Sequence, residues 1–411
     1  MKPIRQDADY IIQEAIRKVL PDEAVAGALQ GRDFSDGNLY VIAAGKAAWQ
    51  MAKTASAILG DRIKDGVVVT KYDHVKEDIP GMVCYEAGHP IPDENSFKAT
   101  QAALDLVTNL TAEDTVLFLL SGGGSALFEK PVISGDELSD ITRQLLACGA
   151  DILEINTIRK RLSRVKGGKF ASFCEPAKIF SIVLSDILGD PLDMMASGPA
   201  YPDSSTCQDA LDIASKYNLQ LSPKALECLQ QETPKSLANV ETVATGSVRN
   251  LCIAAKDACE ELGYETMILT DQLDCEAREA GAFLAAIAKT HTHTKKSLAF
   301  IAGGETIVHL TGNGKGGRNQ ELALSAARGI SGLPGTAVFS IGSDGTDGPT
   351  DAAGGYCDNE TAHILSQKGV GIFNVLRNND TYSALSLCDG LIITGATGTN
   401  VNDVAVLLIK R

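Results

Sequence analysis

Residues 39–52 read LYVIAAGKAAWQMA, an uninterrupted apolar run that turns at Gly45 into a segment of helical periodicity. Short apolar runs without polar alternation are typical of strands buried on both faces, and such strands belong to parallel sheets covered by helices. The same pattern recurs up to about residue 230. It predicts strands over residues 39–45, 65–71, 115–123 and 178–186, and helices over residues 7–20, 46–59, 96–110 and 136–146. The sequence therefore predicts an α/β fold built on a parallel sheet.

A polar segment in the middle of the chain, QETPKSLAN at residues 231–239, lacks periodicity and contains Pro234. It predicts a boundary between a domain over residues 1–235 and a second domain over residues 240–411. In the second domain we expect strands over residues 265–270, 297–304, 306–312, 336–344 and 404–410, and helices over residues 248–262, 277–290 and 319–328. A chain of 411 residues exceeds the usual size of one hydrophobic core, so two α/β domains with a cleft between them are expected.

The formal net charge of −15 argues against a nucleic-acid partner, because nucleic-acid binding depends on basic surfaces that neutralise phosphates. No stretch of about 18 uncharged apolar residues occurs, and the N-terminal segment has no apolar core of signal-peptide length. We therefore expect neither membrane insertion nor export. The 10 cysteines lack the spacing of metal ligands and are expected to be reduced thiols in the cytoplasm.

Two predicted strands end in residues suited to anion binding, and ligands of open parallel sheets bind beyond the carboxyl ends of the strands. After Gly45, Lys46 opens a helix, where N–H groups and a point charge favour phosphate or carboxylate; a plain turn with a solvated lysine is the alternative. A second strand breaks into a glycine-rich loop that consists of Ser121, Gly122, Gly123, Gly124 and Ser125. Adjacent glycines are typical of loops whose backbone approaches a ligand closely, which predicts contacts with nucleotide phosphates.

Aspartates follow two other predicted strands. The candidates for holding a divalent cation are Asp186, Asp190, Asp344, Asp347 and Asp351. Magnesium in phosphoryl transfer is held by one or two carboxylates together with substrate phosphates. Helix N-caps and acidic turns are the structural alternatives.

Residues 312–318, GNGKGGR, fit the pattern G-x-G-x-x-G. As a dinucleotide fingerprint the match is weak, because no acidic residue about 20 positions later is placed to hold a ribose. Gly314, Lys315 and Arg318 instead favour an anion-binding loop at a helix N-terminus, with a flexible surface turn as the alternative.

The segment INTIRKRLSRVKGGKFA at residues 155–171 is basic in an otherwise acidic chain. On a helix, Lys160 and Arg164 would share one face. The cluster suits an anionic ligand or a counter-charge to neighbouring carboxylates, and a solvated helix face is the alternative.

Seven motifs occur in this order along the chain: AAGKAAWQMA, GHPIPDENS, LSGGGSALF, INTIRKRLSRVKGGK, LSDILGDPLDMMASGP, GGETIVHLTGNGKGGRNQELAL and GSDGTDGPTDAAGG. The series resembles that of the glycerate 2-kinase family, whose C-terminal part is the MOFRL domain, and covers nearly the whole chain. The resemblance implies a kinase that uses ATP and Mg²⁺ to convert D-glycerate to 2-phosphoglycerate. It also implies a Rossmann-like N-terminal domain, a smaller α/β C-terminal domain of MOFRL type and an active site between them.

Carried over by motif, Lys46 and Arg318 are the residues that the resemblance places at the active centre. Nucleotide roles for the glycine-rich loop, and metal roles for Asp186 and Asp190, are also implied. The oligomeric state, a homodimer included, stays open.

The main alternative is an NAD(P)H-dependent hydroxypyruvate reductase, a label that members of this family often carry. The late G-x-G-x-x-G without a ribose-binding acid argues against it. His89 precedes Pro90 in a predicted loop and is not expected to serve as the acid of a hydride transfer. A non-catalytic sensor of phosphorylated acids would keep the glycine-rich loops without needing the aspartates.

Overall fold

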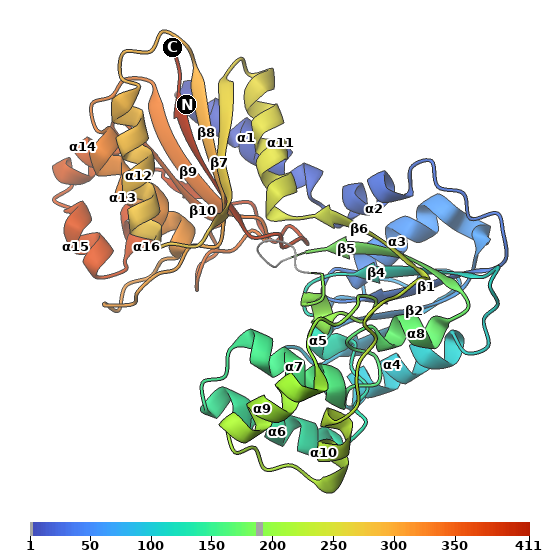
Figure 1. Ribbon diagram of the computed structural model, residues 1–411. Coiled ribbons are helices and arrows are strands. Elements are labelled where there is room, and N and C mark those ends of the chain that lie inside the picture. Colours follow the sequence, from blue (N-terminus) through green and yellow to red (C-terminus); the bar gives the residue numbers. More distant parts are fainter. Residues whose placement is uncertain (1–2, 186–191) are drawn as a thin grey trace. The chain divides into compact units, whose positions relative to one another are not determined.

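The computed structural model describes residues 3–185 and 192–411, and its contacts divide the chain into two compact units (Figure 1). One unit comprises Ala24–Thr245, and the other comprises Met1–Glu23 with Gly246–Arg411. The sequence predicted a division at residues 235–240. The contacts group the chain differently, because residues 240–246 form a strand of the first sheet and the N-terminal helix packs in the core of the second unit.

The first unit contains a six-stranded sheet. Its strands are β1 (Leu39–Ala44), β2 (Ile63–Lys71), β3 (Met82–Ala87), β4 (Thr115–Leu120), β5 (Lys178–Leu184) and β6 (Val240–Gly246). They lie in the order β3-β2-β1-β4-β5-β6, the strand order of doubly wound dinucleotide-binding folds. The pairings among β1 to β5 are parallel. The predicted Rossmann-like parallel sheet is confirmed.

Helices cover both faces of this sheet, because successive side chains of a strand point to opposite faces. From β1, Ile42 packs in one core with α4 (Glu94–Leu106) and α8 (Lys169–Cys174). Val41 packs in the opposite core with α3 (Ala48–Leu59). The buried strands hold the loops at their ends in fixed positions.

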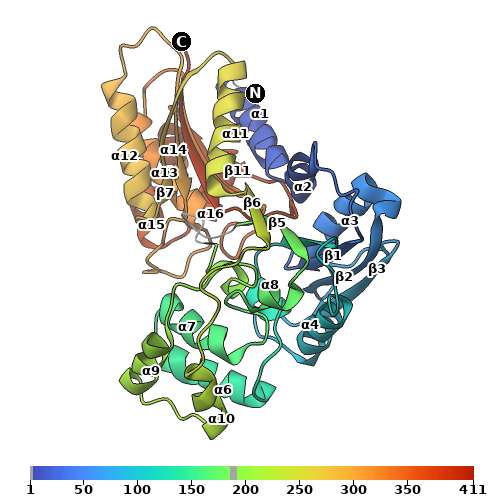
Figure 2. The same cartoon turned by 45° about the vertical axis from the view of Figure 1, so that its right-hand side comes forward.

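Four helices form a separate layer of the first unit with its own apolar core (Figures 1 and 2). They are α6 (Gly135–Ala147), α7 (Ile152–Leu162), α9 (Cys207–Lys216) and α10 (Pro223–Leu229). The sequence predicted only the first as a helix. The remaining helices of this part are α2 (Pro21–Leu29), η1 (Gly60–Arg62), α5 (Gly124–Leu127) and η2 (Met195–Ser197).

The second unit contains a mixed six-stranded sheet. Its strands are β7 (Glu265–Leu273), β8 (Leu298–Gly304), β9 (Thr336–Gly342), β10 (Gly354–Asp358), β11 (Leu391–Ile392) and β12 (Asp403–Ile409). They lie in the order β11-β10-β9-β12-β8-β7. The C-terminal strand β12 lies between β8 and β9 and is antiparallel to both.

Helices also cover both faces of the second sheet (Figure 2). On one face lie α1 (Pro3–Lys18) and α11 (Val248–Glu261), and on the other lie α12 (Ala277–Thr290) and α13 (Arg318–Ile330). The short helices are α14 (Thr361–Gln367), α15 (Ile372–Arg377) and α16 (Thr381–Ser386). None of the helices described here is long and apolar enough to cross a membrane.

Two local predictions are wrong. Residues 306–312 form no strand, and Ile307 makes only an isolated bridge to Glu276. The basic helix α7 ends at Leu162, because Ser163 has an extended backbone (ψ 150°), so Arg164 does not continue the helix face of Lys160.

Candidate active site

Polar and charged residues gather where four parallel strands of the first sheet end. Lys46 follows β1, Lys71 ends β2, His89 follows β3, and the glycine-rich loop at residues 121–125 follows β4. Because the four strands are parallel, their carboxyl ends meet at one edge of the sheet. This is the edge at which doubly wound sheets bind their ligands.

The glycine-rich loop is tied to the start of α3. The Lys46 N–H donates to the carbonyl oxygen of Gly122 at 2.8 Å, and the Ala47 N–H donates to Ser121 Oγ at 3.1 Å. Gly123 has a φ of 84°, in the left-handed region that favours glycine. Among the described residues, the N–H groups of Gly122 and Gly123 meet no hydrogen-bond acceptor. The loop therefore retains two backbone donors, while the buried hydroxyl of Ser121 is used within the turn.

Lys46 and His89 border the same glycine. A side chain on Gly123 would begin 3.0 Å from Nε2 of His89 and 3.1 Å from Cγ of Lys46. Burial, together with the positive charges of Lys46 and Lys71, lowers the pKa of His89 below its usual value. The imidazole is therefore neutral at neutral pH.

Two members of the basic segment hold the far end of the glycine-rich loop. Lys166 is fully buried, and its Nζ donates to the carbonyl oxygens of Ser125 at 2.9 Å and Phe128 at 3.2 Å. Arg159 Nη2 donates to the same Ser125 oxygen at 3.0 Å. The buried carboxylate of Glu129 lies 3.4 Å from Lys166 Nζ. Burial lowers the pKa of Lys166 to about 8.

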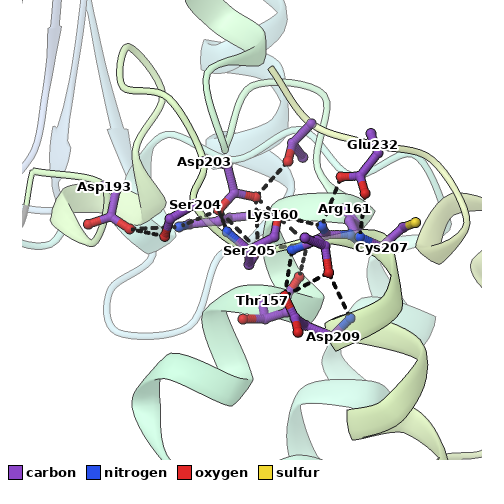
Figure 3. Close-up of polar contacts among 12 residues, drawn as sticks. Thr157, Lys160, Arg161, Asp193, Asp203, Ser204, Ser205, Cys207, Asp209 and Glu232 are labelled. Carbon is purple, nitrogen blue, oxygen red and sulfur yellow. Dashed lines mark hydrogen bonds and ion pairs between the residues drawn. The ribbon is translucent and has the colours of Figure 1, made fainter. Parts of the chain in front are cut away.

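Lys160 and Arg161 form a buried ion-pair network with the segment that precedes α9 (Figure 3). Lys160 Nζ lies 3.0 Å from Asp203 Oδ1 and 3.5 Å from Asp193 Oδ2. Arg161 Nη1 lies 3.7 Å from Asp203 Oδ2 and donates to Ser205 Oγ at 2.9 Å. Lys160 and Arg161 therefore act as counter-charges to neighbouring carboxylates, one of the three interpretations open from the sequence.

In the second unit, two carboxylates hold Arg318 at the start of α13. Its Nε and Nη2 donate to the two oxygens of Asp403 at 2.6 Å and 3.1 Å, and its Nη1 donates to Glu305 Oε1 at 2.7 Å. The guanidinium is one-third exposed, whereas Asp403 is buried. Burial raises the pKa of Asp403 to about 6, although Arg318 opposes the shift.

Asp347 caps the N-terminus of α13. Its carboxylate accepts the backbone N–H groups of Asn319 at 3.1 Å and Gln320 at 2.9 Å, and it is buried. The N–H groups of the second and third residues of the helix are therefore bound by a carboxylate of the chain itself.

The backbone of the glycine-rich segment before α13 is also engaged within the chain. Gly314 N–H donates to the carbonyl oxygen of Asn378 at 2.8 Å, and Lys315 N–H donates to Asp380 Oδ1 at 3.2 Å. Lys315 Nζ lies 4.2 Å from the centre of the Tyr382 ring. Gly314 and Lys315 therefore have no free backbone N–H group for a nucleotide, whereas the N–H groups of Gly316 and Gly317 meet no acceptor among the described residues.

The predicted metal ligands that the structure describes accept hydrogen bonds from other groups of the chain. Asp344 Oδ1 accepts a backbone N–H of its own turn at 2.9 Å, and Asp351 Oδ1 accepts the hydroxyl of Tyr382 at 2.7 Å. Asp186 and Asp190 lie outside the described residues. Within residues 3–185 and 192–411, no group of three or more His, Cys, Asp or Glu could hold a metal ion.

Four residues at the two sites were not predicted from the sequence: Lys71, His89, Glu305 and Asp403. The positions of Lys71 and His89 at the site depend on the pairing of β2 with β3. The sequence did not predict β3, because this strand has no clear apolar run. Asp403 is the first residue of β12, directly before the predicted strand. A search for charged residues at every strand end would have found Lys71 and Asp403.

The sequence matches a domain of unknown function, DUF4147, over residues 7–230, and the MOFRL family over residues 298–403. D-glycerate 2-kinase of Thermotoga maritima is 52% identical, over 99% of this chain and 98% of its own length. A putative hydroxypyruvate reductase of Agrobacterium vitis is 37% identical, over 91% of this chain and 100% of its own length. The crystal structure of glycerate kinase from Thermotoga maritima superposes with a TM-score of 0.96 at 50% identity, covering 100% of both chains.

Proposed function

Because the chain belongs to the glycerate 2-kinase family, we propose that it transfers the γ-phosphoryl group of ATP to the 2-hydroxyl of D-glycerate and releases 2-phosphoglycerate. Its 52% identity to a D-glycerate 2-kinase over nearly the full length supports this activity. The observation that carries the proposal is the meeting of Lys46 with the glycine-rich loop at the carboxyl edge of the first sheet.

We assign the phosphates of ATP to this edge. The N–H groups of Gly122 and Gly123 are donors for phosphate oxygens, and the ammonium of Lys46 supplies a positive charge beside them. Lys166 and Arg159 fix the Ser125 end of the loop, so that its backbone is already ordered before the nucleotide arrives. Phosphoryl transfer depends mainly on such positioning and neutralisation of charge.

Arg318 is assigned to the acceptor carboxylate or to the transferring phosphoryl group. A guanidinium has five N–H groups. Three of them are used by Asp403 and Glu305, so two remain for a ligand. Asp403 and Glu305 hold the guanidinium plane in place, which suits recognition of a carboxylate or phosphate.

A magnesium ion in this enzyme would take most of its ligands from the phosphates of ATP and from water. The described residues suit an ion with few protein ligands better than an ion surrounded by protein carboxylates, because both carboxylate oxygens of Asp347 already accept hydrogen bonds within the chain. Asp344 retains one oxygen without a partner among the described residues. We propose Asp344, together with Asp186 and Asp190, as the carboxylates available to the ion, which would neutralise charge on the phosphates.

Removal of divalent cations is expected to slow turnover by about 10²-fold, because the ion stabilises charge on the phosphates. The measurement is ADP formation from ATP and glycerate with excess chelator, followed by titration with Mg²⁺. Asp344→Asn should need more Mg²⁺ for half-maximal activity if Asp344 is a ligand. Full turnover in excess chelator would show that no divalent ion takes part.

Gly123→Val is expected to raise the KM for ATP at least about tenfold, a loss of about 1.4 kcal/mol of binding free energy. The new side chain would meet His89 and Lys46. Gly149→Val is the matched control, because Gly149 also has a left-handed φ, of 74°, yet a side chain there meets nothing within 4 Å. If both variants lost stability alike and both kept the wild-type KM, the loop would have only a structural role.

The reductase alternative has less support, because the chain is only 37% identical to the putative hydroxypyruvate reductase and 52% identical to the D-glycerate 2-kinase. The test is a coupled assay of ADP formation with glycerate, ATP and Mg²⁺, run beside oxidation of NAD(P)H with hydroxypyruvate. The proposal requires the first activity and no measurable second one.

We place the reaction in the cytoplasm, where ATP is abundant and thiols stay reduced. All 10 cysteines are free in the structure, which suits a reducing compartment. The partners of the proposed enzyme are small molecules, ATP and glycerate, and a homodimer is compatible with this role.

A further inference from the structure

His89 points its ring at the glycine-rich loop. Both Nε2 and Cδ2 lie 3.0 Å from the position of a first side-chain atom on Gly123. Lys46 Cγ lies 3.1 Å from the same position. The imidazole, on the loop that follows β3, therefore stands beside the residues assigned to the phosphates of ATP.

The ring nitrogens of His89 have no hydrogen-bond partner among the described residues, although the side chain is only partly exposed. At the surface, by contrast, a ring nitrogen of His363 pairs with Gln367 at 2.8 Å. A half-buried imidazole with both nitrogens available is suited to a ligand.

The surroundings of His89 favour the form with a free lone pair. Burial disfavours the charged ring, and the positive charges of Lys46 after β1 and Lys71 at the end of β2 act in the same direction. The nearby carboxylate of Asp93, before α4, is bonded to Tyr72 and Ser96. A neutral imidazole has one nitrogen that accepts a proton.

We propose that His89 is the proton acceptor of the reaction, an inference that rests on the kinase activity proposed above. As the 2-hydroxyl oxygen of glycerate forms its bond to the γ-phosphorus, its proton passes to the free nitrogen of His89. The bond between the γ-phosphorus and the β,γ-bridging oxygen breaks, and ADP leaves with that electron pair. The imidazolium then returns its proton to water, so the enzyme is unchanged at the end of the cycle.

Lys46 does not fit this role. Its ammonium has three donors and no lone pair, so it neutralises charge but accepts no proton. His89 and Lys46 thus have separate functions beside the same glycine: the lysine stabilises the phosphoryl group, and the histidine takes the hydroxyl proton.

The test compares His89→Asn and His89→Gln with a control, His74→Asn. The pKa of His74 is also lowered by burial and by Lys71, and its ring is not among the atoms nearest to Gly123. The measurement is kcat at saturating ATP and glycerate as a function of pH, because kcat reports groups in the substrate-bound enzyme. Melting temperature and the KM for ATP are measured for each variant.

The wild type and His74→Asn should lose kcat at acid pH, as His89 takes up a proton before the reaction. Both His89 variants should lose about 10²-fold in kcat at neutral pH, with little change in the KM for ATP, and the acid limb of the profile should disappear. Near-normal kcat, an unchanged acid limb, or a loss confined to the KM for ATP would overturn the proposal. A wild type without glycerate-dependent ADP formation would instead refute the kinase activity itself.

Discussion

Lys46→Ala is expected to lower kcat/KM for glycerate phosphorylation on the order of 10³-fold, the upper range for loss of one preorganised electrostatic group. Lys46 lies at the carboxyl edge of the first sheet, beside Gly123, where the N–H groups of Gly122 and Gly123 meet no acceptor among the described residues. The alanine variant would leave negative charge on the moving phosphoryl group without its nearest lysine. The loss should appear mainly in kcat.

Folding should be almost unaffected by this change, because Lys46 makes no ion pair with the described residues and its removal leaves no buried carboxylate unpaired. Lys53→Ala, in the helix α3 that follows Lys46, is the matched control, since Lys53 is paired with Glu77 at the surface and its side chain is 46% exposed. The measurement is steady-state kinetics together with melting temperature. Near-normal turnover of Lys46→Ala would remove Lys46 from the active centre.

Arg318→Ala is expected to reduce kcat/KM on the order of 10³-fold as well. Arg318→Lys should restore little activity, because a point charge cannot replace the planar fork that binds Asp403 and a ligand together. The measurement is kcat and the KM for glycerate for both variants. A rise in the KM for glycerate would show that Arg318 binds the carboxylate of glycerate. A fall in kcat alone would show that Arg318 binds the transferring phosphoryl group.

Arg318→Ala is also expected to lower the melting temperature. Asp403 is buried, and Arg318→Ala would leave its carboxylate without the guanidinium. The double variant Arg318→Ala/Asp403→Asn separates the two effects, since it should recover stability without recovering activity. Near-normal turnover of Arg318→Ala would contradict the assignment.

The first sheet could be predicted because its central strands are continuous apolar runs, as in residues 39–44 and 115–120. The order of the second sheet could not, because β12 inserts between β8 and β9, which lie far earlier in the chain. No local sequence pattern indicates which distant strands pair. Half-exposed edge strands, β3 among them, also lack the apolar run that reveals a buried strand.

The candidate site was predictable in the same way: residues next to predicted strands could be found, and roles that depend on distant parts of the chain could not. Lys46 and the glycine-rich loop could be found because each directly follows a predicted strand. The amides around Gly314 resembled an anion-binding loop, yet they bind Asn378 and Asp380, more than sixty residues later. Asp347 resembled a metal ligand and caps α13, a role that depends on tertiary contact.

The most direct test of the central claim identifies the product formed from ATP and D-glycerate. Purified enzyme is incubated with both substrates and Mg²⁺, and ADP and phosphoglycerate are quantified, with enolase added to consume the 2-phosphate selectively. Lys46→Ala, prepared in the same way, controls for contaminating kinases. We predict equal amounts of ADP and of a phosphoglycerate that enolase consumes without a mutase. ADP formation independent of glycerate, or NAD(P)H oxidation with hydroxypyruvate and no ADP from glycerate, would contradict the account.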